Sequence, residues 1–291
     1  MDGIARLLNS AYTDKVAGFV PFSVAGEIVG WLRPVFAQVL HAFPDVFVDD
    51  AAGAVQMHPR LDQPDARGHA MADVVRELAR TALITGWRDE LYPVHSDGAR
   101  SEPALLTIER AAARAFGITS HAVHVNGVVT SGAAPEMWIA RRSLSKPIDP
   151  GMLDNMIGGG LTAGLSVGEA LVKEGWEEAG LGPEQLAAAT SGRLVRIRRE
   201  VPEGLQSEII HVHDLELPPA VTPRNTDGEV SEFQRLQINT VLELLDEGNQ
   251  ITPDASLVIL DWLDRRGLAV LPDSPQVRAI FSSAPSALPF H

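Results

Sequence analysis

Residues 158–181 read GGGLTAGLSVGEALVKEGWEEAGL and decide the fold of the chain. The second half of this stretch predicts a helix from about residue 166 to residue 179. Ser166 is a favourable N-cap, and Glu169 follows three residues later, which is the spacing of a capping box. Gly180 is placed to end the helix, because glycine readily adopts the left-handed conformation of the C′ position.

Three acidic residues share one face of this predicted helix. Glu174, Glu177 and Glu178 stand at positions i, i+3 and i+4, so their carboxylates crowd together and repel one another. Carboxylate, water and phosphate oxygens are what Mg²⁺ binds in proteins. The pattern therefore predicts a cation site that meets a phosphorylated substrate. The alternative is an ordinary solvated acidic helix, which the glycine triplet and capping box in register with the acids oppose.

Length and composition limit the class of protein. The 291 residues suffice for two domains or one large one, and a hydrophobic fraction of 45% can form an ordinary core. The net charge of −14 disfavours nucleic acid as a partner, because its phosphates would be repelled. The absence of cysteine excludes disulfides and thiolate metal sites. Since neither a long apolar run nor a secretory leader pattern is seen, we expect no membrane partner and a cytoplasmic location.

The rest of the chain predicts alternating helices and strands. We expect a hairpin that turns at residues 25–27 and a helix after Pro34. A further helix is expected over residues 66–87, with inward-facing residues at helical spacing: Met71, Val74, Val75, Leu78 and Ala82. The other expected helices cover 103–117, 232–248 and 255–267, and the expected strands cover 121–129, 136–143, 193–201 and 207–217. A proline-containing tail (271–291) follows, loose or docked as a strap.

The stretch 158–181 resembles a Nudix box. That pattern is Gly, five residues, Glu, seven residues, Arg-Glu, an apolar residue, any residue, Glu-Glu, any residue, Gly and an apolar residue. The residues that match are Gly159, Glu174, Glu177, Glu178, Gly180 and Leu181. Three positions depart from the pattern. Leu165 stands at the first Glu, Lys173 replaces Arg and loses its bidentate fork, and Gly175 replaces an apolar residue, which weakens the helix by up to about 1 kcal/mol.

Segments outside the box are similar to one branch of this superfamily, the thiamine-pyrophosphokinase-related Nudix proteins. They are WLRP (31–34), WRDELYPV (87–94), IERAAARAFGI (108–118), HVNG (124–127), WIARRS (138–143), KPIDPGMLDN (146–155), DLELP (214–218) and NTDGEV (225–230). The similarity runs from about residue 20 to about residue 270. It implies hydrolysis of thiamine diphosphate, or of its damaged oxo and oxy analogues, to the monophosphate and phosphate. No counterpart of the kinase domain is present, so kinase activity is not expected.

The resemblance also implies the architecture. We expect a Nudix fold over residues 116–270, an α/β/α sandwich with a mixed sheet, preceded by a smaller α/β domain over residues 1–115. A substrate pocket is expected between the box helix and the N-terminal domain, because pockets often form at domain junctions. By analogy, a homodimer is favoured.

The resemblance assigns the metal and catalytic roles to acidic residues. Glu174, Glu177 and Glu178 would hold Mg²⁺, with Mn²⁺ as an alternative, and Glu174 or Glu177 would orient the attacking water. Glu229 is the candidate for a further carboxylate, as ligand or base. The alternative for Glu229 is an exposed acid in an Asp-Gly turn.

The substrate-binding candidates lie on both sides of the box. Arg141, Arg142 and Lys146 could hold the diphosphate, although strand alternation allows only one of the two arginines to face the cleft. Trp87 could stack on a substrate ring beside Arg88, and the favoured alternative is that Trp87 seals the interface between domains. The remaining candidates are Asn155, Gly159 and Gly160. Asn155 could instead close a turn.

Other polar residues of the strands are expected to be structural. Asn126 is expected to close a turn rather than to bind substrate. His211 and His213 share a strand face at a spacing compatible with a metal site, but no third ligand is in view, so ordinary strand histidines are favoured.

Two other functions stay open. The box determines the metal chemistry and not the substrate, so a hydrolase of ADP-ribose or of a nucleotide sugar is an alternative. An isopentenyl-diphosphate-isomerase-like enzyme would need a catalytic cysteine, which the chain lacks. A non-catalytic module that senses a diphosphate is the other alternative, and the complete set of three glutamates opposes it.

Overall fold

The computed structural model describes residues 2–14, 16–96 and 103–282. Its largest sheet has the strand order β13-β8-β7-β12-β11-β14, with β10 paired to β7 and β9 paired to β8. The strands are β7 (Thr119–Val129), β8 (Glu136–Arg142), β9 (Leu153–Asp154), β10 (Ile157–Gly160), β11 (Thr190–Val201), β12 (Gly204–Glu216), β13 (Val230–Gln237) and β14 (Phe281–Ser282). The sheet is mixed, because β12 runs parallel to β7 whereas the other pairs are antiparallel.

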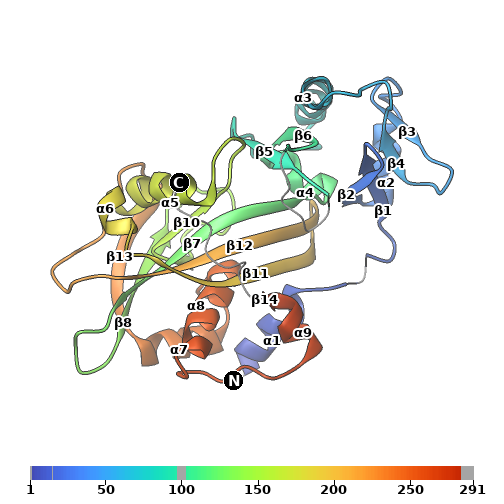
Figure 1. Ribbon diagram of the computed structural model, residues 1–291. Coiled ribbons are helices and arrows are strands. Elements are labelled where there is room, and N and C mark those ends of the chain that lie inside the picture. The colour runs from blue at the N-terminus through green and yellow to red at the C-terminus, as the bar shows by residue number, and fades with distance from the viewer. Residues whose placement is uncertain (1, 15, 97–102, 283–291) are drawn as a thin grey trace.

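Helices cover both faces of this sheet (Figure 1). One face carries α5 (Val167–Ala179) and α6 (Pro183–Leu186), and the other carries α1 (Asp2–Ala11), α7 (Ile238–Glu247), α8 (Pro253–Arg265) and α9 (Pro275–Ile280). Strand β7 is buried on both sides, as expected for a central strand. Its Ala122 and Val128 pack into the core under α7 and α8, whereas Val123 and Val125 join the clusters of the α5 side.

A second, smaller α/β region lies at one end of the large sheet (Figure 1). Its four-stranded sheet has the order β2-β1-β4-β3. The elements of this region are β1 (Val20–Val24), β2 (Glu27–Leu32), α2 (Pro34–Leu40), β3 (Phe47–Asp49), β4 (Val55–Met57), α3 (Pro64–Arg80), β5 (Leu91–Val94), β6 (Leu106–Glu109), the 3-10 turn η1 (Arg110–Ala112) and α4 (Ala113–Phe116). They share one core, in which the rings of Phe22, Phe47 and Phe116 lie within contact of one another.

The N-terminal helix α1 does not pack in this smaller region, although it precedes it in the chain. Its Leu8 and Ala11 are buried in the core beneath the large sheet, where α1 contacts α7 and α9. The domain limits 1–115, 116–270 and 271–291 stay predictions.

Several expected elements are present as predicted. The hairpin β1–β2 turns at Ala25 and Gly26, both with positive φ. The helix after Pro34 is α2, and the helix over 166–179 is α5.

Three expected helices are wrong in part. Residues 106–109 form strand β6, paired with β5, and only the short η1–α4 segment before Gly117 is helical. Helix α3 ends at Arg80, so Ala82, with a φ of 58°, lies in the following turn and not on the helix face. Residues 232–237 belong to β13, because β8 offers a free edge for pairing, and α7 begins only at Ile238.

The expected tail takes part in the fold as far as the structure describes it. Residues 275–280 form α9, and Phe281 and Ser282 pair with β11. The rest of the tail, 283–291, lies outside the described residues. No helix of the described segments is long and apolar enough to cross a membrane.

Candidate active site

Helix α5 positions the acidic cluster, and its ends are set by its own sequence. The Ser166 hydroxyl accepts a hydrogen bond from the Glu169 amide at 3.2 Å, and the Glu169 carboxylate accepts one from the Ser166 amide at 2.8 Å. Gly180 closes the helix in the left-handed conformation, with a φ of 65°. Ala170 and Leu171 are fully buried against the sheet, so the helix is fixed in rotation as well as in length.

Glu174 lies directly over the glycine strand β10. A β-carbon built on Gly159 would stand 2.2 Å from Cδ of Glu174, so only glycine leaves room for this carboxylate. The ammonium of Lys173 donates to Glu174 at 2.8 Å and to Glu177 at 2.7 Å. Burial nevertheless raises the pKa of Glu174 above its ordinary value, and the neighbouring charge of Glu177 adds to this effect.

Glu178 is the most buried acid of the cluster, at 5% exposure. Its carboxylate accepts a hydrogen bond from the Gly158 amide at 2.7 Å. Burial raises the pKa of Glu178 to about 8, with a further rise from Glu174 and an opposing effect of Lys146. The local environment therefore lacks enough positive charge to balance these carboxylates.

The residue types fit a divalent cation, although their present side-chain positions do not form a closed site. Among the residues that the structure describes, no group of three His, Cys, Asp or Glu is arranged to hold a metal ion. Glu174 and Glu177 are directed at Lys173, and Glu178 is directed at Gly158. Three hard oxygen donors, two of them with raised pKa values, still match what Mg²⁺ or Mn²⁺ binds. The Lys173 ammonium already places one positive charge between two of them.

Glu229 stands apart from this cluster. It forms an ion pair with Lys146, and its backbone amide donates to Asp227 at 2.8 Å within the Asn-Thr-Asp-Gly turn. Lys146 is largely buried, and burial lowers its pKa, while Glu178 acts in the opposite direction. Lys146 therefore pairs with Glu229 and also interacts electrostatically with Glu178 of the acidic cluster.

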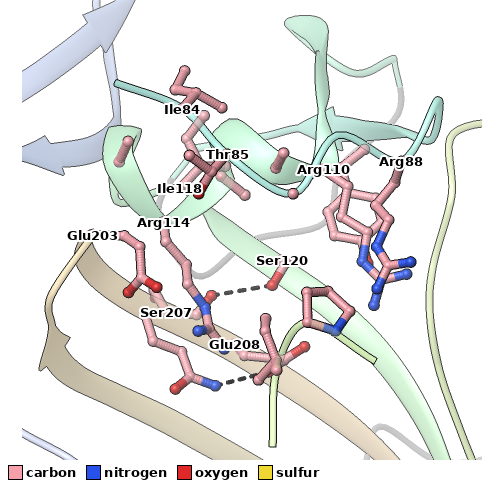
Figure 2. Close-up of a pocket in the computed structure, with 18 of the residues that line it drawn as sticks. Ile84, Thr85, Arg88, Arg110, Arg114, Ile118, Ser120, Glu203, Ser207 and Glu208 are labelled. Carbon is pink, nitrogen blue, oxygen red and sulfur yellow. Dashed lines mark hydrogen bonds between the residues drawn. The ribbon is translucent and has the colours of Figure 1, made fainter. Parts of the chain in front are cut away.

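Lys146, whose charge interacts with Glu178, also lines a pocket of about 450 Å³. Figure 2 shows this pocket. It is bounded by residues 83–86 and 88, by η1 and α4, by β7 and β12, and by the end of β8 with the segment 146–148 that follows it. Five cationic side chains line it: Arg88, Arg110, Arg114, Arg142 and Lys146. The apolar lining includes Ile84, Ile118 and Ile148. Arg110 is fixed by Glu90, which accepts its hydrogen bond at 2.8 Å, and it lies over the Tyr92 ring.

Comparison with known proteins identifies the family. Residues 120–255 match the NUDIX domain, and residues 3–120 match a domain of unknown function, DUF4743. The chain is 37% identical over 263 residues to Nudix hydrolase 24, chloroplastic, of Arabidopsis thaliana, which covers 90% of this chain and 71% of that protein. The chain belongs to the Nudix hydrolase family.

A second relative, Nudix hydrolase 20, chloroplastic, of the same plant, is 36% identical over 270 residues, covering 90% of this chain and 71% of the relative. Among solved structures, DR0079 from Deinococcus radiodurans is 24% identical, with a TM-score of 0.40, over 62% of this chain and 97% of that one. Because the NUDIX match covers residues 120–255, the large sheet with helices on both faces is the expected Nudix fold, preceded by a separate α/β region, and α5 is the Nudix helix.

Two departures from the Nudix box have a structural reason. Leu165, at the first Glu position, packs with Val123, Leu161 and Val167, so this position contributes to the core. A β-carbon on Gly175 would lie 2.5 Å from Leu186 of α6, so glycine permits α6 to pack closely on the Nudix helix.

Of the three cationic side chains predicted to bind the substrate, the structure places two at the pocket and one outside it. Arg142 and Lys146 line the pocket, and Arg142 donates to Asp154 at 2.7 Å. Arg141 lies outside the pocket lining, where it donates to Glu232 at 2.8 Å and to the Gly151 carbonyl at 2.9 Å. Strand alternation thus places one arginine of the pair at the pocket.

Of Trp87 and Arg88, both predicted to bind substrate, only Arg88 lies at the pocket. Arg88 lines the pocket (Figure 2). The Trp87 side chain is outside that lining; its residue is 40% exposed, and its indole N–H donates to Asp89 at 2.7 Å. The expectation that Trp87 seals a domain interface is wrong, because the ring is too exposed.

The two asparagines belong to a buried network. Asn155 pairs with His124 at 2.8 Å and donates to Asn126 at 3.1 Å, and Asn126 donates to Asp214 at 3.1 Å. The expectation of a turn at Asn126 is wrong, because this residue is fully buried within β7. Gly160 lies against the Tyr92 hydroxyl, and a β-carbon there would stand 1.8 Å from that oxygen.

Four charged pocket residues were not predicted from the sequence: Arg110, Arg114, Glu203 and Glu208. The two arginines fell in a segment expected to be one helix, and the actual strand–turn–helix brings both to the pocket. Glu208 ends a short polar run in β12 after Gln206 and Ser207, and such a run is also typical of a solvated strand. The sequence offered no third ligand beside His211 and His213. In the structure, Nδ1 of His121 lies 3.2 Å from Nε2 of His211, but these rings form no metal site among the described residues.

Proposed function

We propose that this Nudix hydrolase cleaves the diphosphate linkage of thiamine diphosphate, or of its oxo and oxy analogues, and that it requires Mg²⁺, with Mn²⁺ as an alternative. The products are the monophosphate and inorganic phosphate. The proposal rests on one observation above all: the lining of a cation-rich pocket of about 450 Å³ includes Lys146, whose charge acts on Glu178 of the Nudix helix. That volume is in the ordinary range for small-molecule sites of roughly 300–1,000 Å³.

The pocket supports a substrate that is anionic at one end and carries a ring at the other. Arg142 and Lys146, beside the acidic cluster, suit a diphosphate, because guanidinium and ammonium groups form charge-assisted hydrogen bonds with phosphate oxygens. The isoleucines of the lining offer apolar surface for a ring. The similarity of segments across the chain to the thiamine-related Nudix branch supports thiamine diphosphate over other diphosphates of this shape.

In the proposed reaction Glu174, Glu177 and Glu178 would hold the cation. The bound cation would neutralise charge on the phosphate oxygens. Glu174 or Glu177 would orient a water molecule and accept one of its protons. The water oxygen bonds to phosphorus while the bridging P–O bond breaks, and the monophosphate leaves with the electron pair. Arg142 and Arg88 would hold the departing and the attacked phosphate in line.

Cation binding would require one rearrangement. The Lys173 ammonium stands between Glu174 and Glu177, so we propose that it moves aside when the cation binds. Both lysine–carboxylate pairs are partly exposed, and pairs of this kind cost little to separate.

A substrate panel tests the proposal. Purified protein with Mg²⁺ is offered thiamine diphosphate, oxythiamine diphosphate, ADP-ribose and nucleoside diphosphates, and phosphate-containing products are measured. We expect turnover of the thiamine compounds, loss of turnover in Glu177→Gln, and no loss in Glu184→Gln, an exposed acid on α6. Turnover confined to ADP-ribose would contradict the thiamine assignment. Binding without any cleavage would favour a sensor of diphosphates.

A further inference from the structure

We propose that Glu208 determines substrate specificity by accepting hydrogen bonds from the N–H donors of a nitrogen heterocycle at the end of the pocket away from the diphosphate. This inference rests on the proposed function, because the acidic cluster defines which end holds the phosphates. The expected substrate class is therefore the diphosphate of an amino-bearing heterocycle.

The first observation is the chemistry of the lining. Glu208, on β12, is an acidic side chain in a pocket whose other charged groups are mostly cations. Figure 2 shows it between the sheet strands and Arg114, with Ser120 and Ser207 nearby. A carboxylate would repel a diphosphate at close range, so it is not part of a phosphate subsite. It is suited to the opposite end of a bipolar ligand.

The second observation is the spacing of the acidic groups along β7. Gly158, whose amide donates to Glu178, is paired with His124 of β7. Glu208 is paired with Ser120, four residues away on the same strand. Four strand residues span about 13 Å, so Glu208 lies at a distance from the acidic cluster and from the phosphates that it would hold.

The third observation is that the Glu208 carboxylate is poorly satisfied. Within the described part of the chain, one hydrogen bond reaches it, from the Gln206 amide at 3.2 Å. Burial raises its pKa, and Asp254 raises it further, which shows that the charged form lacks compensation. An ionised carboxylate accepts several hydrogen bonds and donates none. A ligand with amino or ring N–H groups supplies what this side chain lacks.

The apolar lining of the pocket offers a surface for a ring. In the view of Figure 2, Ile84 and Ile118 lie above Arg114 and Glu208 lies below it, so a ring that extends from Glu208 past Arg114 would contact aliphatic side chains. Sites that hydrogen-bond a substrate N–H reject analogues that lack it far more strongly than apolar pockets do. We therefore expect Glu208 to contribute to discrimination and the acidic cluster to catalysis.

The test compares thiamine diphosphate with pentyl diphosphate, which has the same reacting group and no N–H donor. In the wild type we expect a higher kcat/KM for thiamine diphosphate. Glu208→Leu should lower that value by about tenfold to a hundredfold, mainly through KM, as expected for loss of a hydrogen bond to a charged group. Pentyl diphosphate should be cleaved as before. Glu208→Gln should restore part of the preference, because the amide oxygen still accepts.

Controls separate this inference from the proposed function. Glu216→Gln, on the same strand but outside the pocket lining, should keep the wild-type preference. A Glu208→Leu protein that melts like the wild type and keeps its preference would overturn the role of Glu208. A wild type inert toward every diphosphate would contradict the proposed function instead. In that case calorimetry with thiamine monophosphate decides the role of Glu208, and equal affinity of the wild type and Glu208→Leu would overturn it.

Discussion

Gly159 and the Glu174 carboxylate compete for the same space, since a β-carbon on Gly159 would lie 2.2 Å from Cδ of Glu174. Gly159→Ala should therefore displace the carboxylate without removing it. We expect kcat/KM to fall by about a hundredfold, the usual effect of a displacement near 1 Å in an active site. Gly132→Ala is the control, because a β-carbon there meets its nearest atom at an ordinary 3.5 Å. Wild-type kinetics in a folded Gly159→Ala protein would show that Glu174 is not in the reacting geometry.

The Nudix helix was predictable because its signals are local. Ser166, Glu169 and Gly180 set its ends through contacts within a few residues, and the three glutamates follow from helical periodicity. The helix expected over 232–248 failed at its start for the opposite reason. Residues 232–237 are held by pairing with β8, about ninety residues away in sequence, and no local signal reports a distant free edge.

The pocket residues also differ in how far they could be predicted from local sequence. Arg142 and Lys146 lie close in sequence to the box and were predicted as ligands, whereas Arg110 and Glu208 come from elements nearly a hundred residues apart. Their meeting depends on how the smaller region packs against β7 and β12, which a single sequence does not specify. The 40% exposure of Trp87 was missed for the same reason.

Arg141 and Arg142 provide a matched pair for the diphosphate site. Arg142 lines the pocket and Arg141 pairs with Glu232 outside it. We expect Arg142→Gln to raise KM by about tenfold to a hundredfold, the range for loss of a charge-assisted hydrogen bond. Arg141→Gln should leave KM within about twofold, because an exposed pair contributes little. Steady-state kinetics of both variants decides, and a reversed ranking would place the diphosphate on the other side of β8.

Lys173 should compete with the metal ion. Its ammonium bridges Glu174 and Glu177, so a divalent cation must displace it before binding both carboxylates. We expect Lys173→Met to lower the Kd for Mn²⁺, measured by calorimetry, by up to about tenfold, since each partly exposed pair is worth about 1 kcal/mol or less. Lys173→Arg retains the charge and should keep the wild-type Kd. Weaker binding in Lys173→Met would indicate that the lysine organises the carboxylates and does not compete for them.

Asp261 is predicted to be a principal electrostatic support of α8. It is fully buried, forms an ion pair with Arg193, and accepts from Arg265 at 2.8 Å. Asp261→Ala leaves Arg193 with Asp264 and Arg265 with Asp214 as the remaining carboxylate partners, so we expect the free energy of unfolding to drop by about 3 kcal/mol, the low end of the range for breaking a buried ion pair. Asp73→Ala removes an exposed ion pair with Arg76 on α3 and should cost no more than about 1 kcal/mol. Urea denaturation followed by tryptophan fluorescence measures both, and equal losses would contradict the prediction.

His213 should make stability depend on pH in the acidic range. Burial on β12 lowers its pKa below the ordinary value of 6.5, although its ring pairs with the His211 carbonyl at 3.1 Å. Above pH 6.5 the His213 ring is neutral in both the folded and the unfolded chain, so it does not make stability depend on pH there. As the pH falls through 6.5, the unfolded chain takes up a proton that the folded chain resists, and stability is lost until the lower folded pKa is passed. His213→Asn should therefore lose less stability than the wild type between pH 7.5 and pH 5.5 in thermal denaturation. His69→Asn, at an exposed position on α3, serves as the control, and an identical pH dependence in His213→Asn and the wild type would show that this burial does not oppose protonation.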